Sequence, residues 1–430
     1  MLELYFDAVA KSCPNRWQGR VSQVIGHLLE SDGPFCSVGE CCEVETAEQR
    51  FAGEIVGFRA AKVLSMCLQR PQGIRYGDRI VAWGQRPVIR VGDALLGRVI
   101  DAVGDPLDGK GSYASCITRM IDGAAPAPLE RLPIREPLGC GVRAIDGFLT
   151  CGRGQRMGIF GGSGVGKSTL VGMMARGTSA DLTVLALVGE RGREVGEFLE
   201  ELGPEGRGRS VVVVSTSDQS PLLRVRAALA ATSIAEHFCA QGKQVLLVVD
   251  SLTRFAMAQR EIGLAAGEPP TAKGYTPSVF TLLSRLVERA GRFDGGSITA
   301  FYSVLMEGDD EQDPLVDAVR ALLDGHIVLD RQLTSRGHYP PISILNSLSR
   351  LMPAVSSDEH RQKAGALRSL LALYARSEDL IRVGAYQKGT DPQLDVAIAA
   401  LPKLDAFLRQ DSSQTAPLQD NIRELLQLAS

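Results

Sequence analysis

A glycine-rich stretch near the middle of the chain has the residue types and spacing that bind phosphate. Its sequence, GGSGVGKST over residues 161–169, matches the pattern G-x-x-x-x-G-K-[ST]. In this pattern the glycines let backbone N–H groups turn toward an anion, Lys167 reaches the terminal phosphates, and the Ser168 hydroxyl binds magnesium. We therefore predict a nucleoside triphosphate site formed by Gly161, Gly162, Ser163, Gly164, Val165, Gly166, Lys167, Ser168 and Thr169.

The residues on either side of this loop support the prediction. Residues 156–160 read as a short strand, and residues 170–175 as the start of a helix whose N-terminus favours negative charge. The alternative is a flexible glycine-rich turn. The lysine–serine pair in register and the strand–loop–helix context favour the phosphate loop.

A carboxylate that follows an apolar run is a candidate metal ligand. The run VLLVVD over residues 245–250 predicts a buried strand that ends in Asp250. This strand end places Asp250 at the C-terminal edge of a sheet beside the phosphate loop, where it can bind magnesium through water. Alone, such an aspartate equally suits a helix cap, but Lys167 and Ser168 upstream favour the magnesium role.

A second predicted strand ends in charged residues, VGERGRE over residues 188–194. Phosphate hydrolysis needs a group that orients and polarises the attacking water, and Glu190 is the natural candidate. Arg191 can neutralise phosphate charge and Glu194 can support the metal shell. From the residues alone, a solvated position for Arg191 and Glu194 stays equally open.

Length and composition limit the class of protein. A chain of 430 residues is too long for one core, so we expect two or three domains. The net charge of −3 gives no overall basic footprint for nucleic acid. The nine cysteines show no repeated C-x-x-C pair and predict free thiols in a reducing compartment, with a metal site at Cys41 and Cys42 as the weaker alternative. No apolar run reaches the ~18 residues that span a bilayer, so we expect a cytoplasmic protein that can dock on a membrane complex.

The pattern of apolar residues changes along the chain. Residues 16–87 have short apolar stretches between turn signals, as in a small β domain, and residues 102–137 predict a long ordered connection. Past Pro353, apolar residues recur at helical spacing and predict an all-α C-terminal domain. Between these parts, near-continuous apolar runs predict strands buried on both faces of a mostly parallel sheet; the runs cover residues 183–188, 210–215, 244–250, 297–306 and 325–330.

Several segments together resemble one family. GGSGVGKST, VGERGREV, VLLVVDSLTRFAMAQREIGLAAGEPP, KGYTPSVF and GHYPPISILNSLSRLMP are similar to segments of the rotary ATPases, and most of all to those of the flagellar protein-export ATPases. The likeness is detailed over residues 92–353 and continues more loosely through VGAYQKGTDPQLDVAI. Residues 256–262 and the acidic residues 307–314 favour the flagellar branch over the related injectisome branch.

The resemblance implies an α/β fold. We expect a RecA-like P-loop NTPase core with an N-terminal small β-barrel and a C-terminal α-helical domain. The expected boundaries are a short N-terminal segment at 1–15, the barrel at 16–87, the ATPase domain at 88–352 and the helical domain at 353–430.

The resemblance also implies roles for single residues. Lys167 would bind the phosphates, Ser168 and Asp250 the magnesium, and Glu190 would polarise the water. Arg191 and Arg254 would lie near the terminal phosphate of ATP. Two further residues lie in the segment GHYPPISILNSLSRLMP. Tyr339 matches the aromatic side chain that stacks on adenine, and Arg350 matches the arginine finger that enters the neighbouring subunit's site.

A finger that acts on the neighbouring subunit implies a ring, which has six subunits in this family. The alternative for Arg350 is a surface salt bridge worth about 0 to 1 kcal/mol. The resemblance further implies a central stalk protein at the acidic residues 307–313, for which a solvated turn is the alternative. It also implies a stator-like dimer at the N-terminus, export-gate membrane proteins, export substrates and chaperones, and no nucleic acid.

The chain departs from the family in two places. Ser343 stands where the family normally has Asp, so a contact near the Arg350 loop is expected to differ. The N-terminal segment is short, and its apolar face is limited to Leu2, Leu4, Tyr5, Phe6 and Val9. We therefore expect stator binding that is weak or altered.

The expected function is that of a magnesium-dependent, homohexameric ATPase that serves flagellar protein export in the cytoplasm, at the inner-membrane export apparatus. An injectisome ATPase is the nearest alternative. A ring-shaped transcription-termination helicase would need an RNA-binding N-terminal domain, and residues 16–87 contain aromatic residues but no basic cluster. A non-catalytic ring subunit would typically have an amide at the position of Glu190.

Overall fold

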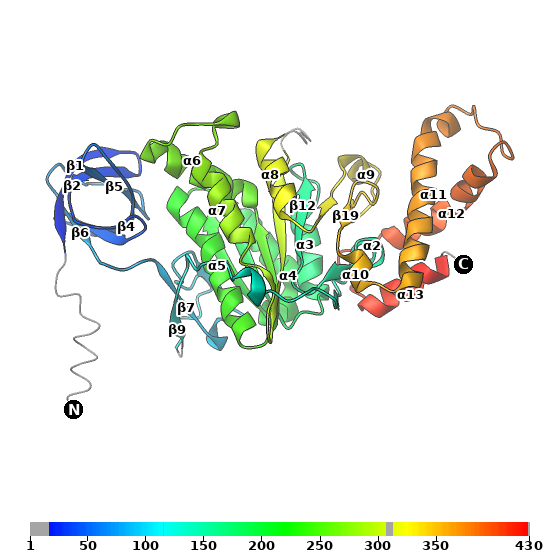
Figure 1. Ribbon diagram of the computed structural model, residues 1–430, viewed down its shortest axis with the longest axis horizontal. Coiled ribbons are helices and arrows are strands. Elements are labelled where there is room, and N and C mark those ends of the chain that lie inside the picture. Colours follow the sequence, from blue (N-terminus) through cyan, green and yellow to red (C-terminus); the bar gives the residue numbers. More distant parts are fainter. Residues whose placement is uncertain (1–16, 115, 307–312, 429–430) are drawn as a thin grey trace.

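Units of different architecture follow one another along the long axis of the molecule (Figure 1). The computed structural model describes residues 17–114, 116–306 and 313–428. A small barrel lies at one end, an α/β unit in the middle and a group of helices at the other end (Figure 1). The predicted order of β-barrel, α/β core and helical domain is confirmed.

The N-terminal unit is a closed barrel whose strands run in the order β1-β2-β5-β4-β3-β6. Alternate residues of its strands point inward, as Phe51 and Ile55 of β4 do. Closure pairs every strand on both sides and leaves no open sheet edge. The strands are β1 Gln18–Ile25, β2 Leu28–Asp32, β3 Cys41–Glu45, β4 Arg50–Arg59, β5 Lys62–Cys67 and β6 Arg79–Ala82.

Short strands follow the barrel. β7 (Val88–Val91) and β8 (Val99–Asp101) precede the connection predicted over residues 102–137, and β9 (Ile117–Met120) lies within it. β7 pairs with β9, and β8 joins the edge of the central sheet. These strands have three or four residues each, which is too short for a clear alternation. The buried Arg289 donates to the carbonyl of Ile121, the residue after β9, at 2.7 Å.

The central unit is built on a nine-stranded sheet in the order β19-β18-β12-β17-β15-β13-β14-β8, with β16 beside β17. Neighbours from β8 to β18 are parallel, while β16 and β19 run antiparallel. The predicted strands are present, although the last one ends at Val328. The strands are β12 Arg156–Gly161, β13 Leu182–Glu190, β14 Ser210–Thr216, β15 Gln244–Asp250, β16 Gly291–Arg292, β17 Ser297–Leu305, β18 Gly325–Val328 and β19 Leu348–Ser349.

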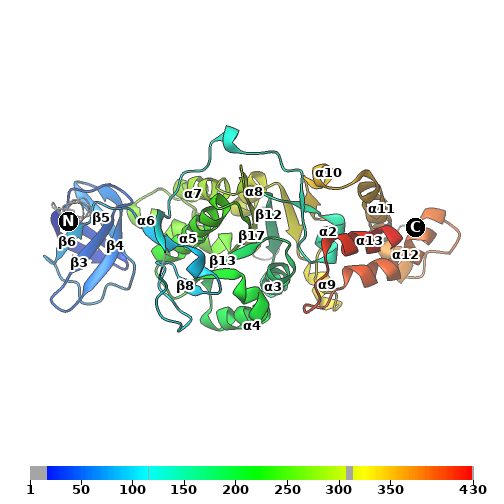
Figure 2. The ribbon, with the colours of Figure 1, turned by 90° about the horizontal axis from the view of Figure 1, so that it is seen from below.

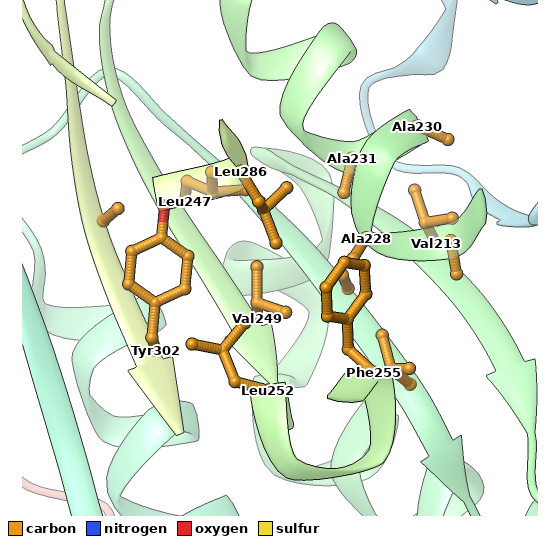
Figure 3. Close-up of a cluster of buried hydrophobic side chains, with 14 of the residues drawn as sticks. Val213, Ala228, Ala230, Ala231, Leu247, Val249, Leu252, Phe255, Leu286 and Tyr302 are labelled. Atoms are coloured by element: carbon orange, nitrogen blue, oxygen red, sulfur yellow. The ribbon is translucent and has the colours of Figure 1, made fainter. Parts of the chain in front are cut away.

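Helices cover both faces of this sheet, which explains the continuous apolar runs. Figure 2 shows the sheet between α7 and α8 on one side and α3 and α4 on the other. In β15, Leu247 and Val249 pack toward α5 and α6, whereas Leu246 and Val248 belong to the core on the opposite face. Figure 3 shows the first of these cores, where Phe255 of α6 and Tyr302 of β17 flank Val249. The helices are α3 Lys167–Gly177, α4 Gly192–Gly208, α5 Pro221–Ala240, α6 Leu252–Ala266, α7 Pro277–Val287, α8 Pro314–Leu322 and α9 Arg331–Ser335.

The C-terminal helices confirm the predicted helical spacing and dock on the short helix α2 (Arg143–Phe148). α2 follows the two-residue strand β10 (Pro137–Leu138) and precedes its partner β11 (Cys151–Gly152). His360 donates to the Gly147 carbonyl at 2.7 Å, and Asn421 donates to Asp146 at 2.7 Å. The helices are α10 Met352–Val355, α11 Asp358–Arg382, α12 Pro392–Leu408 and α13 Leu418–Leu428.

Other sequence predictions concern single residue types. The cysteines within the described ranges are free, and Cys42, Cys67, Cys140, Cys151 and Cys239 are buried. Residues 17–114, 116–306 and 313–428 contain no group of three or more side chains placed to hold a metal through His, Cys, Asp and Glu. In the same part of the chain, no helix has both the length and the hydropathy required to cross a membrane.

Docking of the C-terminal domain depends on close packing at Leu425, which is fully buried. A Cβ atom at Gly147 of α2 would lie 2.7 Å from Leu425 Cδ1, so no side chain separates the two helices. We predict that Leu425→Ala lowers the free energy of unfolding of this domain by about 2–5 kcal/mol, measured by urea unfolding. The exposed neighbour Gln427 provides the control, since Gln427→Ala should change it by less than about 0.5 kcal/mol; equal effects of both substitutions would contradict the packing argument.

Candidate functional site

The predicted phosphate loop lies where β12 ends and α3 begins, at the C-terminal edge of the sheet. Gly164 and Gly166 have φ angles of 76° and 97°, a region that glycine adopts without steric cost. A Cβ atom at Gly161 would lie 3.0 Å from Leu329 Cβ. Backbone conformation therefore explains Gly164 and Gly166, and close packing explains Gly161.

Lys167 is held over its own loop. Its Nζ donates to the carbonyl oxygens of Gly161 at 2.7 Å and Gly162 at 2.9 Å. An ammonium group in this position can exchange a carbonyl contact for a phosphate oxygen without moving far. The predicted contact between Lys167 and the phosphates is compatible with this arrangement.

Side chains from three strand ends line one cavity of about 380 Å³ beside the loop. This volume is within the range of small-molecule sites, roughly 300–1,000 Å³. The phosphate loop contributes Ser163, Gly164, Gly166, Lys167, Ser168 and Thr169. The ends of β13 and β15 and the helices that follow them contribute Glu190, Arg191, Glu194, Asp250 and Arg254. Three residues predicted for the loop are not among the lining residues, namely Gly161, Gly162 and Val165.

Glu190 reaches the cavity because β13 is irregular at its end. Val188 pairs with Ser215 and Glu190 pairs with the next residue, Thr216, so Gly189 is an extra residue in the strand. Gly189 has a φ of 72°, and a Cβ atom there would lie 3.0 Å from Arg254 Cβ. Gly189 thus directs the Glu190 side chain toward the cavity and leaves room for the Arg254 side chain beside the strand.

The carboxyl groups in the cavity influence one another. Burial, the negative charge of Asp250 and a hydrogen bond to Glu194 together raise the pKa of Glu190 to about 8, although the positive charge of Arg254 lowers it. The hydrogen bond from Glu190 lowers the pKa of Glu194. At neutral pH, therefore, Glu190 keeps a proton and donates it in a hydrogen bond to the Glu194 carboxylate.

The residues predicted to hold magnesium offer oxygen ligands. Asp250 is buried at the end of β15, and the Ser303 hydroxyl donates to its Oδ1 at 2.5 Å. Burial raises the pKa of Asp250, whereas this hydrogen bond and the charges of Lys167 and Arg254 lower it. A serine hydroxyl with carboxylates of Asp250 and Glu194 is the donor set of a hard cation such as Mg²⁺, so these residues fit the predicted metal.

Tyr339 and Arg350 do not line this cavity. Tyr339 is half exposed, and its carbonyl accepts from the Gln410 N–H at 2.8 Å, beside the loop that follows α12. Arg350 is exposed after β19, where its N–H donates to the Asp324 carbonyl. Their roles at adenine and in a neighbouring subunit remain predictions.

Some lining residues were not predicted. Arg193, Glu197, Ser251 and Leu305 also face the cavity, and Ser303 contacts Asp250 from behind it. No motif marks Ser303, because its position depends on β17 lying next to β15. Ser343 lies elsewhere, in a second cavity of about 550 Å³ between the α9 region and the C-terminal helices.

The raised pKa of Glu190 predicts a pH dependence of hydrolysis. Below its pKa of about 8, Glu190 is protonated and cannot accept a proton from water. We therefore expect kcat/KM for ATP to rise with pH and to level off above about 8. Glu194→Gln removes the hydrogen-bond acceptor and the charge that favour protonation, so the midpoint should move to lower pH. Glu197→Gln is the control within the same cavity and should leave the midpoint unchanged; a midpoint unmoved in both variants would contradict the pairing of Glu190 with Glu194.

Comparison with known families accounts for most of the chain. Residues 141–349 match the nucleotide-binding domain of the ATP synthase alpha/beta family, and residues 21–84 match the β-barrel domain of that family. Residues 356–427 match the T3SS EscN ATPase C-terminal domain. Each match falls on one of the units seen in the structure.

Curated relatives and solved structures agree with these matches. The chain is 50% identical over 414 residues to the flagellum-specific ATP synthase of Bacillus subtilis, covering 95% of this chain and 94% of the relative. It is 51% identical over 427 residues to the flagellum-specific ATP synthase of Treponema pallidum, covering 99% and 96%.

Two solved structures of EscN, from the type III secretion system of enteropathogenic E. coli, are similar over the whole fold. The assembled ATPase has a TM-score of 0.91 at 43% identity, and the assembled ATPase in complex with its central stalk EscO has 0.88 at 42%. Both comparisons cover 96% of this chain and 100% of the solved chain. The chain therefore belongs to the ATP synthase alpha/beta family, in the branch that contains the flagellum-specific ATP synthases and the type III secretion ATPases.

Proposed function

We propose that this chain is the ATPase of a flagellar type III protein export apparatus. It hydrolyses ATP with magnesium and promotes delivery and unfolding of export substrates and release of their chaperones at the membrane export gate. The observation that carries the proposal is the convergence of Lys167, Glu190 and Asp250 on one cavity, in a chain half identical to flagellum-specific ATP synthases.

The phosphates are bound by the N–H groups of the loop and by Lys167. The start of α3 adds a favourable field, since the N-terminus of a helix attracts anions. Ser168 and Asp250, with Glu194 in support, hold magnesium. The metal, when bound, neutralises charge on the phosphate oxygens during transfer.

Glu190 orients and polarises the attacking water. Its proton, shared with Glu194 in the protein without nucleotide, must leave before the carboxylate can accept one from water. Arg254, whose positive charge lowers the pKa of Glu190, favours that loss. Arg254 and Arg191 are also placed on the cavity wall, where they stabilise charge on the terminal phosphate.

The active form that we propose is a homohexamer. Arg350 is exposed and lies outside the cavity of its own chain, which suits a finger that enters the site of a neighbouring subunit. Tyr339, half exposed, stacks on the adenine. The similar EscN has been solved as an assembled ATPase, which supports assembly of this chain as well.

The proposed partners extend from the ring to the membrane. The complex of EscN with its central stalk EscO supports a stalk protein in the centre of the ring, at the acidic residues 307–313. Of these, only Asp313 lies in the described part of the chain, where Lys273 pairs with it at 2.9 Å. The N-terminal segment 1–15, proposed to bind the stator-like dimer, lies outside the described residues. We place the protein in the cytoplasm, peripherally on the inner-membrane export apparatus, with no nucleic-acid partner.

The proposal predicts that Lys167→Ala abolishes both hydrolysis and export. The chain should restore secretion of flagellar proteins and motility in a bacterium that lacks its own flagellar export ATPase. Lys167→Ala should lose this activity and slow hydrolysis by about a hundredfold or more, because the charge on the transferring phosphate loses its partner. Glu190→Gln should stop turnover yet still bind ATP. This result would distinguish loss of the hydrolysis step from loss of nucleotide binding.

Two outcomes would contradict the proposal. Restored type III secretion of virulence proteins without restored motility would favour an injectisome ATPase. Robust hydrolysis by Glu190→Gln would remove the assigned role of that carboxylate.

An arginine that acts across an interface predicts recovery of activity in mixed rings. Arg350→Ala and Lys167→Ala should each be nearly inactive, since such a finger is worth about 10³ to 10⁵ in turnover. Mixed in equal amounts, they form some interfaces with both an intact phosphate loop and an intact finger, so part of the activity should return. Activity that stays at the level of the separate variants would indicate that Arg350 acts within its own subunit.

A further inference from the structure

We infer that Ser303 is a positioning residue for Asp250 and thereby for the magnesium site, an inference that rests on the proposed ATPase function. Ser303 lies on β17, which is the direct neighbour of β15 in the sheet. The two strands are parallel, with Gln244 beside Ser297 and Val249 beside Tyr302. Extending this register by one residue brings Ser303 beside Asp250 at the point where β15 ends.

The contact between the two side chains is short and shielded from water. The Ser303 hydroxyl donates to Asp250 Oδ1 at 2.5 Å, the length of a strong hydrogen bond to a carboxylate. Ser303 is fully buried, and Asp250 is 4% exposed. Solvent therefore cannot replace the hydroxyl if it is removed.

The hydrogen bond fixes the orientation of the carboxylate. The terminal torsion of an aspartate is broad and has no strong intrinsic preference. Because Ser303 donates a hydrogen bond to Oδ1, the orientation of the Asp250 carboxylate plane is fixed before a cation binds. Groups that orient metal ligands in this way typically contribute 10- to 100-fold to metal affinity.

Another buried hydroxyl on the same sheet provides a matched control. Ser215 lies on β14 and is fully buried, and its Oγ has no hydrogen-bond partner among the residues that the structure describes. Ser215→Ala therefore deletes the same atom from a buried strand without touching Asp250. Any effect of hydroxyl removal on sheet packing alone would appear in both variants.

The test measures the affinity for a fluorescent ADP analogue with Mg²⁺ and with EDTA. We expect Ser303→Ala to reduce the ratio of the two affinities about tenfold, with the affinity in EDTA and the melting temperature near those of the wild type. Ser303→Thr keeps the hydroxyl and should restore the ratio, and Ser215→Ala should leave it unchanged. The Mg²⁺ concentration that gives half-maximal hydrolysis should rise in parallel for Ser303→Ala alone.

The inference is overturned if the ratio in Ser303→Ala stays within about twofold of the wild type. It is also overturned if Ser215→Ala lowers the ratio as much, or if a folded Ser303→Thr does not restore it. The wild type alone tests the proposed function. If Mg²⁺ does not change the nucleotide affinity of the wild type, the magnesium site is contradicted, and the role of Ser303 is contradicted with it.

Discussion

The parallel alignment of the central strands is the constraint on which the site depends. β12, β13 and β15 all point their carboxyl ends to one edge of the sheet, so the segments that follow them meet there. The phosphate loop, Glu190 and Asp250 come from three different strands and still line one cavity. The same alignment places β17 beside β15 and so brings Ser303 against Asp250.

Such a sheet is stable only because both of its faces are covered. Parallel strands occur almost entirely in buried sheets, and β15 sends alternate side chains into the two opposite cores. Burial also sets the chemistry of the edge. Burial raises the pKa of Glu190 and opposes the ionisation of Asp250. The apolar packing that covers the sheet therefore also favours the protonated form of Glu190.

The carboxyl groups of the cavity lie close together although their negative charges repel one another. Glu190, Glu194 and Asp250 lie close enough to affect one another's pKa, and like charges placed together disfavour ionisation. The positive charges of Lys167 and Arg254 offset part of this repulsion at Asp250. A cation at the proposed magnesium site would offset more of this repulsion, and its binding would then favour loss of the proton from Glu190.

The glycines at the site are required for different structural reasons. Gly164 and Gly166 adopt positive φ angles that turn the loop, and the sequence motif was enough to predict them. Gly189 is needed because a side chain there would contact Arg254. That requirement arises between β13 and α6, and it could not be foreseen from the neighbours of Gly189 in the chain.

The sequence by itself determined the local features of this protein. The phosphate loop, the apolar runs of the central strands and the helical spacing past Pro353 are set by residues close together in the chain, and they predicted the corresponding elements. Similarity to a known family added predicted roles for Tyr339 and Arg350. Local patterns in the sequence do not indicate these roles. Tertiary structure decided which strands are neighbours, and therefore the hydrogen bond from Ser303 to Asp250 and the pKa of Glu190. These depend on burial and on contacts between residues far apart in the chain, and no local pattern of residues encodes the order of strands in a parallel sheet.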